Sequence, residues 1–309
     1  MNLRTCMLIA AILLVLPSFA SAFPIQPQPL RQLCADSELI VVAKVEQVVS
    51  VTDKDGYSHS KALLRISTML KGDERNEFAE VLFSPNMICP APPTYPEGGT
   101  VIAFLYRKEG DQFYRTAGLS YGTKVVPEKE AQIYIERIRE ILKILKSDES
   151  PAKEEQIIEW LVRCAEEPVT RWEGAYELFS SNNMTPAQES NHSYGFAAKL
   201  TQQQKSRLSD ALFRSTTISG DDLYLINFLK DKEGERLIPF ILKYLNTIVD
   251  DPPYYTDNLM KIISDNLKSK QAARLTKSFD KISYDQKKKA ERKAILKEFI
   301  SLIEGGATT

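Results

Sequence analysis

Two spacings of apolar residues divide this chain near Pro127. Upstream, apolar and polar residues alternate in short runs rich in valine and isoleucine, separated by Gly, Pro and Asp turns. Alternation with a period of two is typical of half-buried strands, so we predict a small antiparallel barrel or sandwich. The predicted strands are LIVVAKVEQVVSV, KALLRISTML, FAEVLFS, TVIAFLYR, DQFYRT and TKVV.

Downstream of Pro127 the spacing becomes helical. In PEKEAQIYIERIREILKIL, isoleucine and leucine recur every three or four residues, and the rest of the chain follows the same period. Such amphipathic helices are not stable alone, so we expect them to stack as a short HEAT-like solenoid or an irregular bundle. Capping patterns predict helix starts at Ser150 before Pro151, Thr170 with Glu173, Thr201 with Gln204, and Ser283 with Gln286.

The first 22 residues have the pattern of a secretory signal. Arg4 precedes the apolar run 7–16, and Ala20-Ser21-Ala22 forms a small-residue cleavage pattern. The run is shorter than the roughly 20 residues that a membrane span requires, and no later apolar run is longer. We therefore expect a periplasmic or secreted protein with no transmembrane segment after signal cleavage.

Cleavage would leave three cysteines, Cys34, Cys89 and Cys164, which allow three pairings. Cys164 falls on the apolar face of a predicted helix, where a free cysteine packs as a small hydrophobic residue. In an oxidising compartment this favours a disulfide between Cys34 and Cys89.

Residues 34–127 resemble a known module. Cys34-Ala35-Asp36-Ser37 runs into ELIVVAKVEQV, followed by LLRISTMLKG, the cysteine of MICPAPPTYPEGG, and TVIAFLYR. This order resembles the netrin-module domain of tissue inhibitors of metalloproteinases, whose fold is an OB barrel with its N-terminal cysteine tied to a neighbouring loop. The resemblance implies an OB-like barrel and says nothing about the helical half. With the length of the chain and the change of spacing at Pro127, we predict an α+β protein of two domains, an OB-like barrel over residues 23–127 and an α-helical domain over 128–309.

The same resemblance implies less about inhibition. In the inhibitors the cysteine is the first residue of the mature chain, and its free amine reaches the zinc of the target. Here residues 23–33 would precede Cys34, so its nitrogen is an amide unless the chain is trimmed further. A metalloprotease inhibitor is therefore an alternative rather than the leading hypothesis.

Catalytic chemistry is not indicated by the sequence. The only histidines, His59 and His192, lie in different halves, and no nucleophile, phosphate-loop or zinc-protease motif is present, so we expect no metal site and no cofactor. Adjacent acids occur at Glu166-Glu167, Asp221-Asp222 and Asp250-Asp251. Acids beside helix ends are usually solvated, and a carboxylate-based hydrolase is the weaker alternative.

Protein binding is the leading hypothesis. Lys plus Arg (40) balances Asp plus Glu (41), which gives no reason to expect nucleic acid as a partner. The Pro-rich loop PNMICPAPPTYPEGG, residues 85–99, supplies candidate partner-binding residues Met87, Pro92, Pro93 and Tyr95. The basic C-terminal run, residues 268–299, could contact an anionic envelope surface or form a solvated helix face.

Two tryptophans leave a choice open. Trp160 and Trp172 flank a predicted helix turn, where an aromatic pair could grip a sugar or peptide. Tryptophans at helical spacing also serve as anchors between packed helices. Taken together, the sequence predicts an exported, non-enzymatic protein-binding or envelope-associated module.

Overall fold

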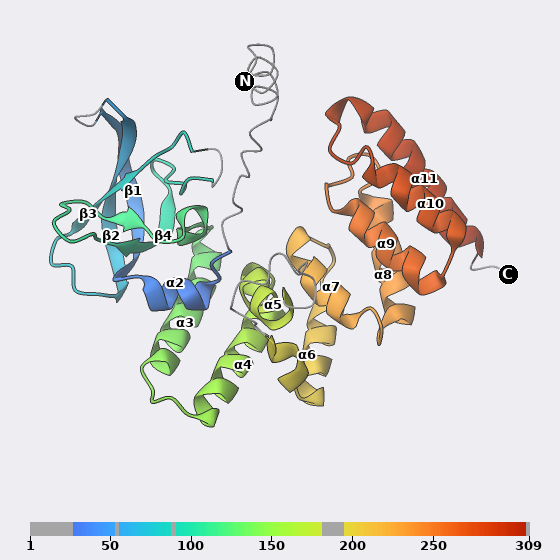
Figure 1. Ribbon diagram of the computed structural model, residues 1–309, viewed down its shortest axis with the longest axis horizontal. Coiled ribbons are helices and arrows are strands. Elements are labelled where there is room, and N and C mark those ends of the chain that lie inside the picture. Colours follow the sequence, from blue (N-terminus) through green and yellow to red (C-terminus); the bar gives the residue numbers. More distant parts are fainter. Residues whose placement is uncertain (1–26, 53–55, 88–90, 181–194, 307–309) are drawn as a thin grey trace, which may run out of the picture.

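The computed structural model describes residues 27–52, 56–87, 91–180 and 195–306 (Figure 1). The predicted signal, Cys89 and His192 lie outside these ranges. The chain is an α+β protein, with a curled antiparallel half-barrel sheet in its N-terminal part and about ten helices in its C-terminal part. The strands are β1 (Leu39–Thr52), β2 (Ser58–Lys71), β3 (Phe78–Phe83), β4 (Thr100–Tyr106), β5 (Arg115–Thr116) and β6 (Thr123–Val125). The α-helices are α2 (Leu30–Asp36), α3 (Glu128–Leu145), α4 (Pro151–Glu166), α5 (Arg171–Phe179), α6 (Gln202–Phe213), α7 (Leu223–Leu229), α8 (Gly234–Thr247), α9 (Thr256–Leu267), α10 (Lys270–Asp280) and α11 (Lys289–Gly306).

The sheet has the strand order β3-β2-β1-β4-β5, and β6 also pairs with β4. Every predicted strand is confirmed, because each alternating run forms one of these strands. The outer strand β3 meets the segment before β5 through a parallel bridge between Val81 and Tyr114. Two backbone hydrogen bonds of 2.9 Å, from Leu82 to Tyr114 and from Tyr114 to Glu80, support this bridge. The two edges of the sheet are therefore joined, which curls it.

Strand β4 contributes to two hydrophobic clusters. Ile102 and Phe104 face the helices and join a cluster that extends from α2 to α11. Val101, Ala103 and Leu105 face the inside of the curled sheet and form a second cluster. The sequence TVIAFLY has no alternating polar face because both sides of this strand are covered. The domain boundary at residue 127 stays a prediction, and the first cluster continues across it.

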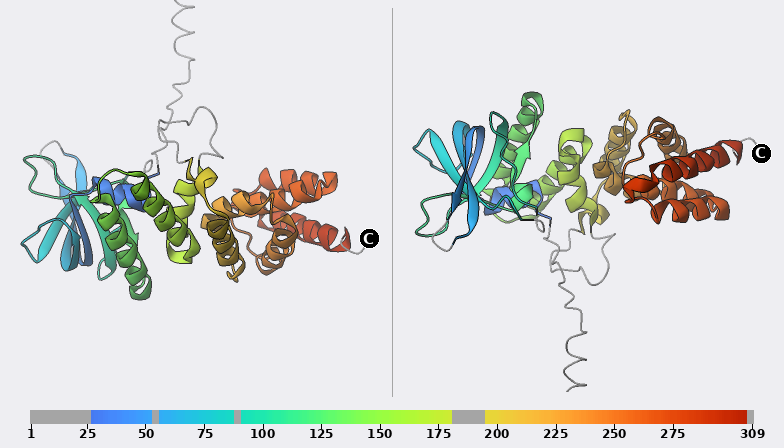
Figure 2. Two further views of the ribbon diagram at one scale, coloured as in Figure 1. Left: turned by 90° about the horizontal axis from the view of Figure 1, so that it is seen from below. Right: turned by 90° about the horizontal axis from the view of Figure 1, so that it is seen from above.

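The helices follow one another along the long axis of the molecule (Figure 2). Neighbours in sequence pack together, as in the pairs α4 with α5, α8 with α9, α9 with α10, and α10 with α11. Trp160 on α4 is 2% exposed, and its indole N–H donates a 2.9 Å hydrogen bond to the Arg137 carbonyl on α3. This tryptophan is therefore an anchor between packed helices. No helix in the described ranges has both the length and the apolar character needed to cross a membrane.

The predicted helix caps have different outcomes. Ser150 Oγ accepts the Lys153 backbone N–H at the start of α4, and Thr201 with Gln204 forms a reciprocal capping box on α6. The start at Ser283 is wrong, because Asp285 caps the short 3₁₀ helix η7 (Gln286–Lys288) before α11. Helix α5 does begin after Thr170, but the side chain of Thr170 does not cap it.

Glu173 instead belongs to a group that holds the start of α2, a helix that the sequence analysis did not predict. Its Oε2 accepts the Leu30 backbone N–H at 2.7 Å, and its Oε1 lies 2.5 Å from Lys124 Nζ. One turn later on α5, Glu177 Oε2 lies 2.6 Å from Arg31 Nη2. We call Leu30, Arg31, Glu173 and Glu177 the N-terminal clamp, because it fixes the beginning of the described chain against the helical part.

Candidate functional site

The residues predicted to bind a partner are separated by the structure. Tyr95 is buried inside the curled sheet, where its hydroxyl is 2.7 Å from Thr116 Oγ1, and burial raises its pKa. Met87 and the buried Pro93 line a small hollow of 120 Å³ on the sheet, and Pro92 is half-buried beside them. Met87 is thus the most exposed of the four side chains, at 36%. Partner binding by this loop stays a prediction.

Cys34 lies in α2 as a buried free thiol. Cys89 lies outside the described residues, so the disulfide between them also stays a prediction. The position of Cys34 bears on the inhibitor alternative, since trimming the chain to Cys34 would remove Leu30 and Arg31. The buried carboxylate of Glu177 would then lose its salt bridge, which is an unfavourable change.

Each adjacent acid pair has at least one member in an ion pair with a basic residue. Glu166 lies 2.6 Å from Arg207, Asp251 lies 2.7 Å from Lys289, and ion pairs also join Asp222 to Arg171 and Asp250 to Lys293. Within the described ranges, no group of three or more His, Cys, Asp and Glu residues is placed to hold a metal ion. His59 Nδ1 is 3.1 Å from Ser84 Oγ at the edge of the sheet.

The basic C-terminal run is partly engaged within the protein. Besides Lys289 and Lys293, Arg292 is 4% exposed and donates a 2.6 Å hydrogen bond to the Ser283 carbonyl. These contacts tie α11 to the segments before α9 and after α10. Contact of this run with an envelope surface stays a prediction.

A groove between α5, α7 and α9 combines the side chains that best suit a binding site. It has a volume of 600 Å³ and contains the aromatic residues Trp172, Tyr224 and Tyr254. The amides Asn227 and Asn258 also line it. We call it the aromatic groove.

Helix α9 forms one wall because of its residue spacing. Asn258, Lys261, Ile262 and Asp265 lie three, four and seven residues apart and share one helix face. Lys261 Nζ and Asp265 Oδ2 form a 2.8 Å surface pair on this wall. Tyr254, just before the helix, is 61% exposed, so it presents a large aromatic surface to solvent.

The opposite wall is made rigid by aromatic contacts. The Trp172 ring stacks on Tyr121 at 5.5 Å between centroids and on Tyr176 at 5.2 Å. Tyr224 meets the edge of Tyr176 at 5.8 Å. Because these rings hold one another, a ligand in the groove would meet side chains that are already ordered.

Acidic and polar groups complete the groove. Partial burial raises the pKa of Asp221, and the nearby charges of Asp222 and Glu173 raise it further. Asn227 Nδ2 donates a 2.9 Å hydrogen bond to the Leu223 carbonyl, which leaves its Oδ1 oriented as an acceptor. The groove therefore offers aromatic surface, amide groups and charges of both signs.

Comparison with known proteins gives no relative for this chain: no family model, curated protein or solved structure matches it.

The aromatic groove was only partly visible in the sequence. Trp172 was noted as one of two tryptophans that could bind a ligand, and it does line the groove, whereas Trp160 is a core residue. The spacing of Asn258, Lys261 and Asp265 on a predicted helix was the other available signal. No local sequence signal indicated that this helix would line a groove together with Trp172, because Trp172 and Lys261 lie almost 90 positions apart in the sequence.

Proposed function

We propose that this protein is an exported, non-enzymatic binding module that holds a segment of a partner polypeptide in the aromatic groove. The observation that carries the proposal is the exposed Tyr254 ring beside an ordered aromatic wall. Solvent-exposed aromatic residues in pre-ordered pockets are typical hot spots of protein recognition.

The chemistry of the groove favours a polypeptide. Amide side chains such as Asn227 and Asn258 can donate to and accept from peptide groups, which an apolar ligand would leave unpaired. Lys261 and Asp265 add charges that can select side chains at the rim. The volume of 600 Å³ suits a few residues of an extended chain, within the range of about 300–1,000 Å³ for small-ligand sites.

The wider architecture is part of the proposal. The Val81–Tyr114 bridge between the sheet edges supports an OB-like barrel of the netrin type in residues 23–127. The succession of packed helices supports a solenoid-like domain in residues 128–309, an arrangement that commonly provides extended binding surfaces. The signal-like N-terminus supports a periplasmic or secreted location.

Selection from a phage-displayed library of random peptides tests the binding proposal. Enriched peptides are synthesised, and their dissociation constants are measured by calorimetry for the wild type, Tyr254→Ala and Asn258→Ala. We expect Tyr254→Ala to weaken binding at least about tenfold, which corresponds to about 1.4 kcal/mol. Tyr284→Ala is the matched control, because Tyr284 is 77% exposed and lies outside the groove.

Two results would contradict this proposal. Peptides that bind the wild type and the Tyr254→Ala variant equally well would remove the groove as the site. If the wild type cleaved a selected peptide and Asp221→Asn did not, hydrolysis would replace binding as the function of the groove.

A further inference from the structure

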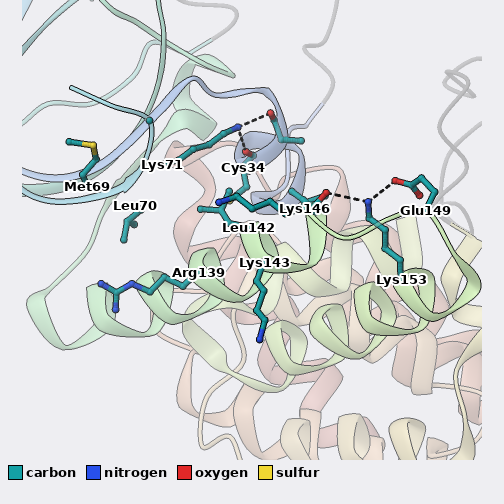
Figure 3. Close-up of a pocket in the computed structure, with 13 residues that line it drawn as sticks. Cys34, Met69, Leu70, Lys71, Arg139, Leu142, Lys143, Lys146, Glu149 and Lys153 are labelled. Atoms are coloured by element: carbon teal, nitrogen blue, oxygen red, sulfur yellow. Dashed lines mark hydrogen bonds and ion pairs between the residues drawn. The ribbon is translucent and has the colours of Figure 1, made fainter. Parts of the chain in front are cut away.

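A second groove lies on the other side of the N-terminal clamp, between the end of β2, the end of α2, and α3 (Figure 3). Its volume is 770 Å³, and its lining includes five basic residues and one acid, Glu149. We call it the basic groove. It shares no lining residue with the aromatic groove.

Two of the basic residues have structural partners that limit what they can offer a ligand. Lys153 Nζ donates to the carbonyls of Leu145 and Ser147 and to Glu149 Oε1, which uses the three donors of an ammonium group. Lys71 Nζ donates to the carbonyls of Cys34 and Ala35, at 2.8 and 3.0 Å. Lys71 therefore keeps one N–H for a ligand, and both lysines hold positive charge at helix C-termini.

Arg139 and Lys146 can offer all of their side-chain N–H donors to a ligand. Arg139 is on α3 and Lys146 is the C-cap residue that directly follows this helix; they lie seven residues apart, which is about two helical turns. Neither side chain has a hydrogen-bond or ion-pair partner within the described part of the chain. Figure 3 shows Lys146 beside Leu142, whereas Lys143 points away from Lys71. The Lys71 and Lys146 ammonium groups lie at the α2 end of the groove, and the Arg139 guanidinium lies at its other side (Figure 3).

The surface between these cations is apolar. Leu70 and Leu142 are half-buried there, and Met69 is 39% exposed at the end of β2. A small inorganic anion would leave this surface in water, and a neutral apolar ligand would leave the cations unused. The lining is complementary to a molecule that has both an acyl chain and an anionic group.

We infer that the basic groove binds one molecule of a single-chain anionic lipid, with its anionic group at Lys71 and Lys146 and its acyl chain on Leu142, Leu70 and Met69, in the direction of Arg139. The volume is within the range of about 300–1,000 Å³ that small-molecule sites have. This binding is independent of polypeptide binding in the aromatic groove.

Calorimetric titration of the full protein tests the inference with three monomeric probes. Lysophosphatidylglycerol carries the acyl chain and a net negative charge, lysophosphatidylcholine has the chain without net charge, and glycerol phosphate has the charge without the chain. We expect lysophosphatidylglycerol to bind at least about tenfold more tightly than either of the others. Equal binding of all three would overturn the inference.

Variants locate the site. Arg139→Ala with Lys146→Ala should weaken lysophosphatidylglycerol binding at least about tenfold, whereas Lys129→Ala, an exposed lysine on the same helix outside the groove, should not change it. Both substituted side chains are exposed, so the fold should persist, and a circular dichroism melt checks this. Met69→Glu, which places an anion on the apolar surface, gives a second loss-of-binding test. Unchanged binding in all these variants refutes the site.

Other ligands separate this inference from its nearest competitors. Displacement of lysophosphatidylglycerol by poly-glutamate at equal charge would show that the groove takes an acidic peptide. Charge-dependent binding to phosphatidylglycerol vesicles, without binding of the monomer, would show a membrane-docking surface. Either result overturns the single-lipid inference.

Discussion

Removal of Arg31 should destabilise the protein by breaking the N-terminal clamp. Arg31 lies 2.6 Å from Glu177, whose side chain is fully buried and whose Oε1 has no hydrogen-bond partner among the described residues. Loss of one partner of a buried ion pair costs about 3–5 kcal/mol, because the other charge stays in a medium of low polarity. Arg31 is 22% exposed, so water can partly replace it, and we expect Arg31→Ala to lower the free energy of unfolding by about 2–4 kcal/mol.

The loss should depend on pH in a defined direction. Burial raises the pKa of Glu177 above its usual 4.5, and Arg31 lowers it, so removal of Arg31 raises it further. The folded variant then binds a proton more readily than the unfolded chain does, and its stability increases as the pH falls through the folded-state pKa of Glu177 towards 4.5. The deficit relative to the wild type should therefore shrink under mildly acidic conditions.

Urea denaturation followed by circular dichroism, at neutral and at mildly acidic pH, measures both effects. The double variant Arg31→Ala with Glu177→Gln is the control, because a buried amide carries no charge. It should be more stable at neutral pH than Arg31→Ala alone. A loss below about 1 kcal/mol, or a loss that does not change with pH, would refute the buried-charge explanation.

Three further predictions concern the helical core. Gly174→Ala should destabilise the protein by at least about 2 kcal/mol in urea denaturation, because a Cβ there would lie 2.2 Å from a backbone oxygen of α4. A denaturation midpoint equal to that of the wild type would contradict this close packing of α5 on α4. Trp160→Phe should lower the free energy of unfolding by about 1–2 kcal/mol in the same assay, since it leaves the Arg137 carbonyl without its indole donor. No measurable loss of stability would show that this hydrogen bond is not needed. Burial raises the pKa of the Cys164 thiol, so iodoacetamide should not modify it at neutral pH until denaturant is added. Peptide mapping detects the adduct, and rapid modification of Cys164 in the folded protein would contradict its burial.

Local sequence patterns predicted the elements better than their contacts. Every strand was predicted, most of them from the alternation of apolar and polar residues and β4 from a short apolar run between turn residues. Helix α2 was missed, since LRQLCAD is short and has no side-chain cap of its own. Its first N–H is satisfied by Glu173, more than 140 residues away. The capping pattern at Thr170 failed for the same reason, because the acidic side chain that it required is used in this distant contact.

The candidate grooves depend still more on distant contacts. Trp172 and Tyr254 come together only after α6, α7 and α8 have packed. The Pro-rich loop attracted attention for its composition, yet its aromatic residue Tyr95 is an internal residue of the sheet. Whether a tyrosine such as Tyr95 binds a ligand or fills the core depends on the side of the backbone on which it lies. The composition of the loop does not determine that side.

The double burial of β4 limits where this chain can be divided. If the polypeptide were cut at residue 127, Ile102 and Phe104, with Ile40 and Val42 on β1, would keep α2 but lose the part of their hydrophobic cluster that α3 and the later helices supply. An isolated sheet fragment would then carry an apolar face that favours aggregation. Recombinant fragments and domain exchanges should therefore retain α3 with the sheet, because α3 packs on both α2 and β2.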